Sequence, residues 1–517
     1  MPKTEQRGVK MRSDVLIVGA GPTGLVLALW LTKLGVRVRI IDKSEQPGTT
    51  SRALAVQART LELYSQLDLD QAVIERGHKV PAVNLWVGGK PKAHLDFTDI
   101  GSGLTPYAFL LIFPQDEHEK LLIERLGELG IAVERQTELI GYREAGDHVV
   151  ADLRGPTGVG EACEALYIAG CDGAHSIVRH VMGTGFPGGT YQRVFYVADV
   201  EASGPPVDGE LHVDLDEADF LAIFPLTAEK HVRLIGAVRN PRHDDDSPLR
   251  FEDVGHQAID HLKVKIEKVN WFSSYRVHHR VADRFRQGRA FLLGDAAHIH
   301  SPVGGQGMNT GIGDAINLAW KLAAVVAQRA SASLLDSYEP ERIAFARRLV
   351  ASTDRAFTMV SSEGTLARIV RTRLAPALLS QIVRFGPFRR FMFRTVSQTT
   401  LNYRGGPLAA GTAGAVSGGD RLPWVKIDGG DNFASLSLMQ WQVHVYGTAR
   451  AELASWCAAH RLPLQVFPWR KEYEAAGLAC DASYLLRPDS YIALADPSGA
   501  PETIERYFNS RGLAGSR

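Results

Sequence analysis

Three glycines near the start of the chain have the spacing of a phosphate-binding turn. The segment from 19 to 24, Gly-Ala-Gly-Pro-Thr-Gly, matches the pattern GxGxxG. In such a turn the first glycine allows the bend, the second lets a pyrophosphate approach the backbone, and the third lets the next helix pack closely. The amides and the dipole at the start of that helix bind the phosphates. The candidate cofactor-binding residues are therefore Gly19, Gly21, Pro22, Thr23 and Gly24.

Such a turn requires a strand before it and a helix after it, and the sequence supplies both. The apolar run 14–18 predicts a buried parallel strand, 25–31 predicts a helix, and 36–41 predicts a second strand. Asp42 ends the second strand, near the spacing of roughly 20 residues at which an acidic residue binds ribose hydroxyls. The pattern predicts dinucleotide binding and leaves open whether the dinucleotide is NAD or FAD.

Two later strand ends also pair glycine with aspartate. The apolar run 165–171 leads into Asp172 and Gly173, and the run 290–293 leads into Gly294 and Asp295. The loop that follows contains Gly304, Gly305 and Gly307, which add no side chains to a core and so indicate a close approach of the backbone to another group. Ligands of open α/β sheets bind beyond the carboxyl ends of the strands, so we expect the three junctions to converge on one crevice.

The composition excludes several classes of protein. The 517 residues include 58 basic and 58 acidic side chains, so no net charge favours a nucleic acid or an anionic membrane. The four cysteines have no zinc-ligand or CxxC spacing, and no metal site is predicted. No apolar run is long enough to span a membrane, and residues 1–12 lack the apolar region of a signal peptide. We expect a cytoplasmic, multidomain protein, for which Met11 is an alternative start.

With these motifs in place, the sequence resembles the class A flavin-dependent aromatic monooxygenases of the p-hydroxybenzoate hydroxylase fold. The matching segments are GxGxxG at 19–24, SRALAVQARTLELY at 51–64, CDGAHSIVR at 171–179, and the stretch 288–322 that begins GRAFLLGDAAH. The larger form, with an added C-terminal domain, is similar to polyketide-tailoring enzymes and phenol hydroxylases. The implied fold is α/β: a Rossmann-type FAD-binding domain, an antiparallel-sheet substrate domain and a thioredoxin-like C-terminal domain.

The resemblance implies FAD as cofactor and NAD(P)H as a transient reductant, since no second GxGxxG follows a strand. Oxygen would be transferred to the substrate through a C4a-hydroperoxyflavin. Besides the GxGxxG residues and Asp42, the resemblance implies cofactor contacts from both later junctions and the glycine-rich loop. These residues are Arg52, Gln115, Asp172, Asp295, Pro302, Gly305, Gly307, Met308 and Asn309.

Four polar residues near these junctions have structural alternatives. Asp172 caps a helix beginning at Ala174 in one interpretation and contacts the cofactor in the other. Arg179 is either part of the site or a surface salt-bridge partner. For His298 and His300 a hydrogen-bonded structural role is favoured over a catalytic one.

The predicted domains alternate along the chain. The FAD-binding domain comprises 12–80, 108–182 and 283–350, and the substrate domain comprises 81–107 and 183–282. A helical segment follows at 351–404, then a Gly- and Ala-rich linker at 405–420, then the thioredoxin-like domain at 421–517. Without a CxxC motif, that last domain is expected to act as a scaffold or as a contact in a homodimer.

The sequence names no acid–base residue with certainty. Related phenol monooxygenases carry an acid at the position of Leu54, so phenol itself is a poor substrate prediction. His212, Asp214 and Tyr196 lie in the substrate domain and are weak candidates for a base. The predicted function is hydroxylation of a phenolic or polycyclic aromatic compound. The alternatives are Baeyer–Villiger or epoxidising chemistry on a related substrate and, more distantly, an NAD-dependent dehydrogenase.

Overall fold

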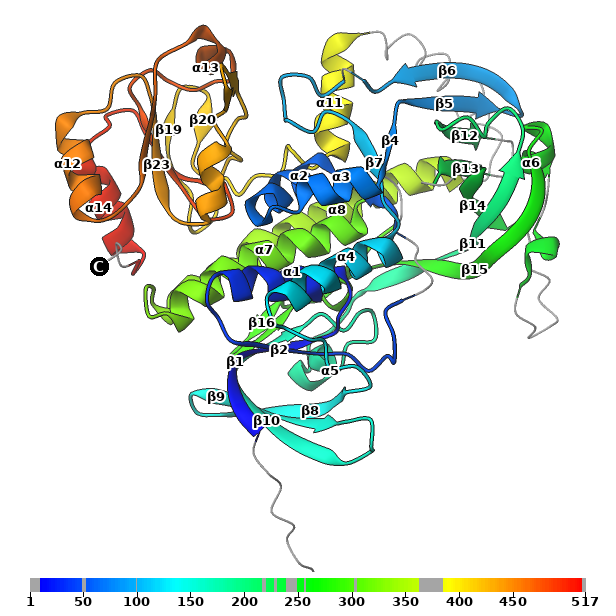
Figure 1. The fold of residues 1–517 in the computed structure, drawn as a ribbon, viewed down its shortest axis with the longest axis horizontal. Helices are drawn as coiled ribbons and strands as arrows, with labels where there is room; N and C mark the ends of the chain where they lie inside the picture. The colour runs from blue at the N-terminus through cyan, green and yellow to red at the C-terminus, as the bar shows by residue number, and fades with distance from the viewer. Residues whose placement is uncertain are drawn as a thin grey trace, which may run out of the picture.

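The computed structural model describes residues 10–48, 53–98, 100–215, 220–226, 230–238, 249–254, 257–301, 305–361 and 385–513. Figure 1 shows a central layer of helices over one sheet, a second sheet on one side, and the C-terminal domain on the other. Within the described ranges, no helix has the length and apolar character that crossing a membrane requires.

The first sheet carries the three glycine–aspartate junctions. β1 pairs in parallel with β2 and with β10, and β10 pairs in parallel with β17. The apolar runs predicted as strands lie in these positions and are buried on both faces, which is why they lack a polar alternation. The strands of this sheet are β1 (Lys10–Val18), β2 (Val38–Ile41), β8 (Glu138–Ala145), β9 (His148–Arg154), β10 (Gly160–Gly170), β16 (Arg286–Gln287) and β17 (Ala290–Leu292).

Helices cover this sheet and form the central layer of Figure 1. Residues Leu25 to Leu31 of α1 are almost completely buried, since α1 packs against both α4 and α7. The helices of this region are α1 (Pro22–Lys33), α2 (Ala58–Tyr64), α3 (Asp70–Arg76), α4 (Gln115–Glu128), α5 (Ile177–Met182), α7 (Gly307–Val326) and α8 (Tyr338–Ser361). A small sheet of β3 (Ala55–Val56), β7 (Leu110–Ile112) and β4 (His78–Val80) lies beside them.

The second sheet has the order β18-β15-β11-β14-β13-β12-β5-β6. Its neighbouring strands are antiparallel except for β12 and β5, so the predicted antiparallel substrate-domain sheet is confirmed. Strand β15 was not predicted, because its polar residues interrupt any apolar alternation. The elements are β5 (Ala82–Val87), β6 (Lys90–Asp96), β11 (Gly188–Ser203), β12 (Leu211–Leu215), β13 (Phe220–Pro225), β14 (His231–Val238), α6 (Gln257–His261), β15 (Lys265–Val281) and β18 (His298–Ile299).

The C-terminal domain is built on a sheet of order β20-β19-β26-β25-β23-β24. The turn that contains Arg487 connects β25 to β26. The likeness to thioredoxin stays a prediction. The elements are β19 (Ala410–Ala413), β20 (Val416–Ser417), β21 (Lys426–Ile427), β22 (Gly430–Asp431), β23 (Gln442–Tyr446), α12 (Ala451–Ala459), β24 (Leu464–Phe467), α13 (Lys471–Ala475), β25 (Ser483–Leu486), β26 (Ile492–Asp496) and α14 (Pro501–Ser510).

The predicted linker at 405–420 is wrong. This run contains β19 and β20, and β19 pairs in parallel with β26 of the domain sheet. A Cβ on Gly411 would overlap the backbone of Ala495, so its small residues allow close strand packing. The run is part of the domain. The other predicted domain boundaries stay predictions.

Within the helical segment predicted at 351–404, residues 362–384 lie outside the described part of the chain. The described part includes α11 (Gly386–Val396), which stands above α2 and α3 in Figure 1. Its Phe393 ring occupies the space that a Cβ on Gly101 would fill, and the Arg59 amide donates to the Ser397 carbonyl (3.1 Å). These contacts attach α11 to the substrate-domain loop and to α2.

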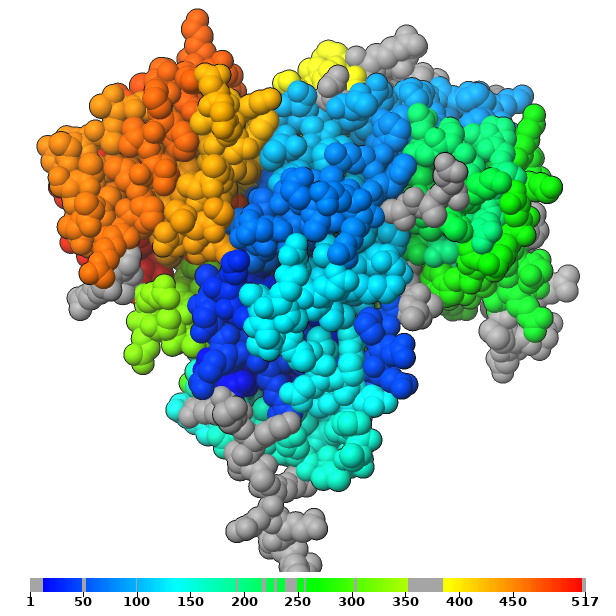
Figure 2. All heavy atoms as spheres, in the orientation of Figure 1, coloured from blue at the N-terminus to red at the C-terminus, as the bar shows by residue number. Residues whose placement is uncertain are grey.

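Buried ion pairs join the C-terminal domain to the helices of the FAD-binding region. Arg487 donates to Glu341 on α8 (2.7 Å) and to Asp489 (2.6 Å), and Lys321 on α7 also donates to Glu341 (2.8 Å). Elsewhere in the interface Arg421 pairs with Glu62 of α2. Figure 2 shows the orange C-terminal domain packed directly against the blue α2 region. Since the paired groups are desolvated, removal of one partner leaves a buried charge uncompensated.

Glu341→Gln should lower the free energy of unfolding by about 3–5 kcal/mol at pH 7 because it breaks this buried cluster. Burial would raise the pKa of Glu341, but Arg487 and Lys321 lower it from 4.5 to about 2. The stability that depends on this carboxylate is therefore present above pH 4.5 and lost as the pH falls toward 2. Denaturant unfolding at several pH values from 3 to 7 should show this loss in the parent chain and a weaker pH dependence in the variant.

The matched control is Glu117→Gln. Glu117 pairs with Lys120 on the exposed face of α4, where the two side chains are 50% and 55% exposed. Its loss should cost less than about 1 kcal/mol. Equal losses in the two variants would contradict the role assigned to the buried cluster.

Candidate cofactor and substrate site

The three junctions lie side by side at one edge of the first sheet. In the strand register Val18 is opposite Gly170, and Gly170 is opposite Leu292. The carboxyl ends of β1, β10 and β17 therefore finish at the same level, so the expected convergence is confirmed for these backbone segments.

Close backbone contacts hold the junctions together. Gly19 has φ +102°, and a Cβ there would overlap the carbonyl of Cys171. A Cβ on Gly24 would overlap the carbonyl of Gly19, and the Thr23 side chain fills the space beside Gly294 and Gly311. Each of these glycines is thus required by the protein's own packing.

Gly21 differs from its neighbours. A Cβ there would have no atom within 4 Å, and its φ of −78° is open to any residue. Packing therefore gives no reason for a glycine at this position. The first helical hydrogen bond of α1 runs from the Leu25 amide to the Gly21 carbonyl (3.0 Å), which leaves the preceding amides of the first turn to face a ligand. This open cradle at a helix start fits a pyrophosphate group.

Asp42 lies beside this cradle. One carboxylate oxygen accepts from the Ala20 amide (2.7 Å), and the other accepts from the Ser44 amide (2.8 Å). Arg135 is 3.7 Å away. Each carboxylate oxygen can accept more than one hydrogen bond, so the position remains compatible with a ribose.

Gln115 begins α4 and donates through its side chain to Glu119 (2.8 Å). Its backbone amide donates to the Ala53 carbonyl (3.1 Å). Arg52 and Pro302, both predicted to contact the cofactor, lie outside the described residues.

Asp172 caps a helix, as the structural alternative predicts. Its Oδ2 accepts from the amides of Ile177 (2.7 Å) and Val178 (3.2 Å) at the start of α5. The helix begins at Ile177, whereas the prediction had it at Ala174. The Oδ1 atom is buried and without a hydrogen-bond partner in the described chain. A role toward the cofactor stays a prediction.

Arg179 is buried and is not a surface salt-bridge partner. Its guanidinium donates to the carbonyls of Ala296 (2.9 Å) and Ala174 (2.6 Å) and lies over the Phe186 ring (4.0 Å). It therefore connects the second junction to the third.

The third junction continues into α7. Asp295 is exposed at the edge, and the preceding Gly294 amide donates to Asp314 (3.0 Å). Asp314 also accepts from His298 (2.7 Å) and from Arg342 (2.5 Å). Although burial would raise the pKa of Asp314, Arg342 and His298 hold it below its usual value. The Asp314 carboxylate thus ties Gly294 and His298 of the third junction to helix α7.

The residues predicted to face the flavin surround the start of α7. Gly305 has φ +60°, and a Cβ there would lie 2.8 Å from the Ala55 Cβ, so β3 itself requires this glycine. Gly307, Met308 and Asn309 form the first turn of α7, before the Thr310 amide bonds to the Gln306 carbonyl (2.9 Å). The positive end of α7 is thereby directed at this loop.

The Asn309 side chain is fully used within the protein. Its Oδ1 accepts from the Gln57 amide (2.9 Å) and the Thr60 hydroxyl (2.7 Å), and its Nδ2 donates to the carbonyls of Ala55 and Gly305 (both 2.9 Å). Any contact of Asn309 with the cofactor would therefore come from its backbone. The side chain positions the loop.

The two histidines of this junction differ. His298 donates to Asp314, which is the structural role favoured from the sequence. His300 donates from Nδ1 to the Ser301 carbonyl (2.8 Å), so its Nε2 is an acceptor; that atom is buried and has no hydrogen-bond partner in the described chain. Nε2 would lie 3.7 Å from a Cβ on Gly307. Burial lowers the pKa of His300 to about 4, so the ring is neutral at pH 7. An unpartnered acceptor beside α7 fits a bound ligand.

The three weak catalytic candidates lie within the second sheet. Tyr196 is buried against Phe272 and Gly236, and Asp214 is buried on β12, where it accepts from the Gly89 amide (3.3 Å). None of the three lines either cavity described below. A role as substrate base stays a prediction for each.

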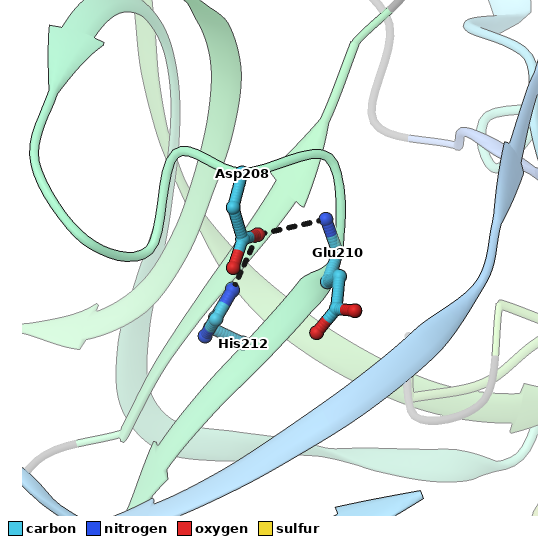
Figure 3. Close-up of side chains that lie close together, drawn as sticks. All are labelled: Asp208, Glu210 and His212. Carbon is cyan, nitrogen blue, oxygen red and sulfur yellow. Dashed lines mark hydrogen bonds and ion pairs between the residues drawn. The ribbon is translucent and has the colours of Figure 1, made fainter. Parts of the chain in front are cut away.

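His212 has both ring nitrogens occupied. Trp86 donates to Nδ1 (3.0 Å), which requires Nε2 to carry the proton that it donates to Asp208 (2.9 Å). Figure 3 shows Asp208, Glu210 and His212 grouped at the start of β12, the one such cluster among the described residues. With Nε2 protonated, no histidine lone pair faces the two carboxylates, so the tautomer argues against a metal ion here.

Residues of α2, or next to it, line two cavities. The aromatic cavity, of about 340 Å³, is lined by Gln57, Phe97, Ile100, Phe109, Leu110, Met392, Phe393, Val396 and Ser397. The polar cavity, of about 350 Å³, lies toward the C-terminal domain, and its charged groups, among them Arg59, Arg342 and Asp489, already pair within the protein. The aromatic cavity therefore has the better character for an apolar ligand.

Residues 12–353 match the family model described as FAD binding domain. The chain belongs to this family. A flavin-dependent monooxygenase from Mycobacteroides abscessus is 32% identical over 96% of this chain and 99% of its own length. The 6-methylpretetramide 4-monooxygenase of Streptomyces rimosus is 36% identical over 78% of this chain and 72% of its own. The solved structure of OxyS anhydrotetracycline hydroxylase from Streptomyces rimosus has a TM-score of 0.76 at 29% identity, covering 97% of this chain and 99% of that one.

The family assignment confirms the predicted fold class, FAD as cofactor and flavin-dependent monooxygenase as the enzyme class. It overturns the NAD-dependent dehydrogenase alternative. A dialkyldecalin synthase from Streptomyces rugosporus is also 32% identical, over 75% of this chain and 80% of its own length. Family membership thus fixes the cofactor more firmly than it fixes the reaction outcome.

Sequence reasoning missed the aromatic cavity. Its walls come from the N-cap residue of α2, from residues 97–110 and from the C-terminal end of α11, and no spacing in the sequence relates these three segments. The sequence also offered no basis for distinguishing His298 from His300. Only the structure shows that Asp314 accepts a hydrogen bond from His298, whereas Nε2 of His300 has no partner in the described chain.

Gly21→Ala tests whether the cradle binds the pyrophosphate. Because nothing in the protein contacts a Cβ there, the unfolding free energy of the apoprotein should change by less than about 0.5 kcal/mol. The dissociation constant for FAD should rise at least about tenfold, which corresponds to about 1.4 kcal/mol. Denaturant unfolding and a titration of FAD fluorescence measure the two quantities.

Gly19→Ala is the contrasting variant. Its positive φ and its overlap with Cys171 should destabilise the apoprotein itself, by about 1–3 kcal/mol. If Gly21→Ala binds FAD as tightly as the parent chain, the cradle is not the pyrophosphate site.

Proposed function

We propose that this flavin-dependent monooxygenase hydroxylates a phenolic or polycyclic aromatic compound, with O2 as co-substrate and NAD(P)H as reductant, in the cytoplasm. The balanced reaction is ArH + O2 + NAD(P)H + H⁺ giving ArOH + H2O + NAD(P)⁺. The observation that carries the proposal is the position of the aromatic cavity, whose Gln57 is bonded directly to Asn309 in the first turn of α7. The homodimer stays a prediction.

The lining of the cavity suits an aromatic ring in its chemical character. Three phenylalanines line it, from both the 97–110 loop and α11, and aromatic rings pack well edge-to-face or offset against such side chains. An apolar lining also binds water weakly, which would help to protect a reactive oxygen donor from wasteful decay.

FAD, when bound, supplies the activation of O2 and the transfer of one oxygen atom. The chain's own residues hold and polarise the site. The first-turn amides of α7 present positive potential that stabilises negative charge developing near them. The neutral His300 adds a buried acceptor beside those amides without adding a charge.

The relatives named as 6-methylpretetramide and anhydrotetracycline oxygenases support a polycyclic aromatic substrate of this kind. Baeyer–Villiger or epoxidising chemistry would use the same cofactor site and the same reductant. No feature of the cavity favours them, and product analysis distinguishes all three.

The test is oxidation of NADH and of NADPH by the purified holoenzyme with a panel of phenols, naphthols and quinones, under ¹⁸O2. We expect an aromatic compound to stimulate oxidation and to gain one ¹⁸O as a ring hydroxyl. Stimulated oxidation that yields only hydrogen peroxide marks that compound as an effector. An ester product would indicate Baeyer–Villiger oxidation in place of hydroxylation, and an epoxide product would indicate epoxidation. A rearranged product without oxygen uptake would overturn the proposal.

A further inference from the structure

Arg135 lies beside Asp42 at the edge of the first sheet, and one of its nitrogens lacks a partner. Its Nη2 atom is buried and has no hydrogen-bond partner in the described chain. Its Nη1 atom lies 3.7 Å from Oδ1 of Asp42, which allows an ion pair but is too long for a hydrogen bond. The Arg135 side chain is only 19% exposed, and a buried donor that is left unpaired costs free energy. The arrangement therefore indicates a ligand that accepts from this guanidinium.

The backbone of Arg135 is held against the end of β2. The Asp42 amide donates to the Glu134 carbonyl (2.9 Å), and the Thr137 amide donates to the Asp42 carbonyl (2.9 Å). The side chain of Glu134 adds a second attachment, since it accepts from Arg39 on β2 (2.8 Å). This segment thus runs alongside the strand that ends in Asp42, and the protein itself keeps the two side chains next to each other.

The charges around Arg135 disfavour a phosphate as its ligand. Asp42 is an acid at the same position, where it accepts from the Ala20 amide (2.7 Å). Glu119, on α4, is also buried; burial raises its pKa, and the charge of Arg135 opposes that rise. A phosphate beside Asp42 would be repelled, whereas the start of α1 offers it free amides. A neutral ligand fits Arg135 better.

The two charged side chains match a pair of neighbouring hydroxyls. An ionised carboxylate only accepts hydrogen bonds and a guanidinium only donates them, whereas a hydroxyl does both. A vicinal diol can therefore donate to Asp42 and accept from Arg135 at the same time. The ring nitrogens of adenine accept only, so they would satisfy Arg135 and leave Asp42 without a donor from the ligand. A ribose fits both residues.

We propose that Arg135 is a cofactor-binding residue, which donates from Nη2 to a ribose oxygen in the adenosine half of FAD while Asp42 accepts from a ribose hydroxyl. The glycine pattern at 19–24 did not indicate Arg135, because it comes from a segment more than a hundred residues later. The assignment concerns the cofactor alone, so it does not depend on the aromatic substrate proposed above.

The test titrates the apoprotein with FAD and with two analogues, one lacking the adenosine 2′-hydroxyl and one lacking the 3′-hydroxyl, and follows flavin fluorescence. We expect the parent protein to bind FAD at least about tenfold more tightly than one of the analogues. Arg135→Met, which keeps the side-chain length without the donors, should weaken FAD binding about tenfold and binding of that analogue less than about threefold. The denaturant midpoint of the apoprotein should change little, because Nη2 has no partner there.

Arg125→Met is the matched control. Arg125 pairs with Glu128 at the exposed end of α4, where the two side chains are 36% and 61% exposed. This variant should keep the parent affinities for all three dinucleotides. Arg135→Leu serves as a second variant without donors if Arg135→Met does not fold.

Each other outcome overturns the assignment in a different way. Equal weakening of FAD and of both analogues by a folded Arg135 variant would overturn the ribose contact, and so would a parent protein that binds all three equally well. An unchanged affinity for FAD would rule out any cofactor contact from this side chain. A lower unfolding midpoint of the apoprotein, with the parent ratios of affinity retained, would make the role of Arg135 structural.

Discussion

Close backbone packing at one sheet edge is the constraint on which the site depends. The turn at Gly19 lies against Cys171, and Thr23 of the next helix lies against Gly294 and Gly311 of the third junction. Three segments separated by more than a hundred residues are thereby fixed relative to one another without flexible side chains between them. Arg179 and Asp314 add hydrogen bonds to backbone groups of the same junctions. A cofactor bound at this edge meets a surface that is organised before it arrives, which lowers the entropic cost of binding.

The C-terminal domain is joined to this arrangement through buried charges. Asp314 accepts from Arg342, which also donates to the Tyr403 hydroxyl (2.8 Å), so the third junction connects to the chain that leads into the C-terminal domain. Glu341, the neighbour of Arg342 on α8, binds Arg487 of that domain. Because these groups are buried, each requires all of its partners to remain in place. This provides a physical reason for the domain to stay attached although it lacks a CxxC motif and contributes no side chain to the aromatic cavity.

The parts of the fold that could be predicted are those set by local patterns. The strand runs before Gly19, Asp172 and Gly294 are apolar throughout, and each sits where parallel strands are buried on both faces. The error at 405–420 has the same origin: Gly and Ala indicate either flexibility or close packing, and only the pairing of β19 with β26 decides between them. Likewise, HxH spacing made His298 and His300 look equivalent. The difference between them depends on Asp314, which lies 14 positions beyond His300 and is brought back by α7.

The candidate cofactor site and the aromatic cavity differ in how the sequence encodes them. The cofactor site is made largely of backbone groups, so it requires glycines at fixed spacings and can be recognised from the sequence alone. The cavity is made of side chains from the N-cap of α2, residues 97–110 and α11, and α11 lies beyond the segment that the FAD-binding family model matches. A wall outside the shared segment can change in shape without disturbing the junctions. The relatives of this chain include both a 6-methylpretetramide 4-monooxygenase and a dialkyldecalin synthase. Under the proposed function, the sheet edge binds the cofactor and the aromatic cavity selects the compound that reacts with it.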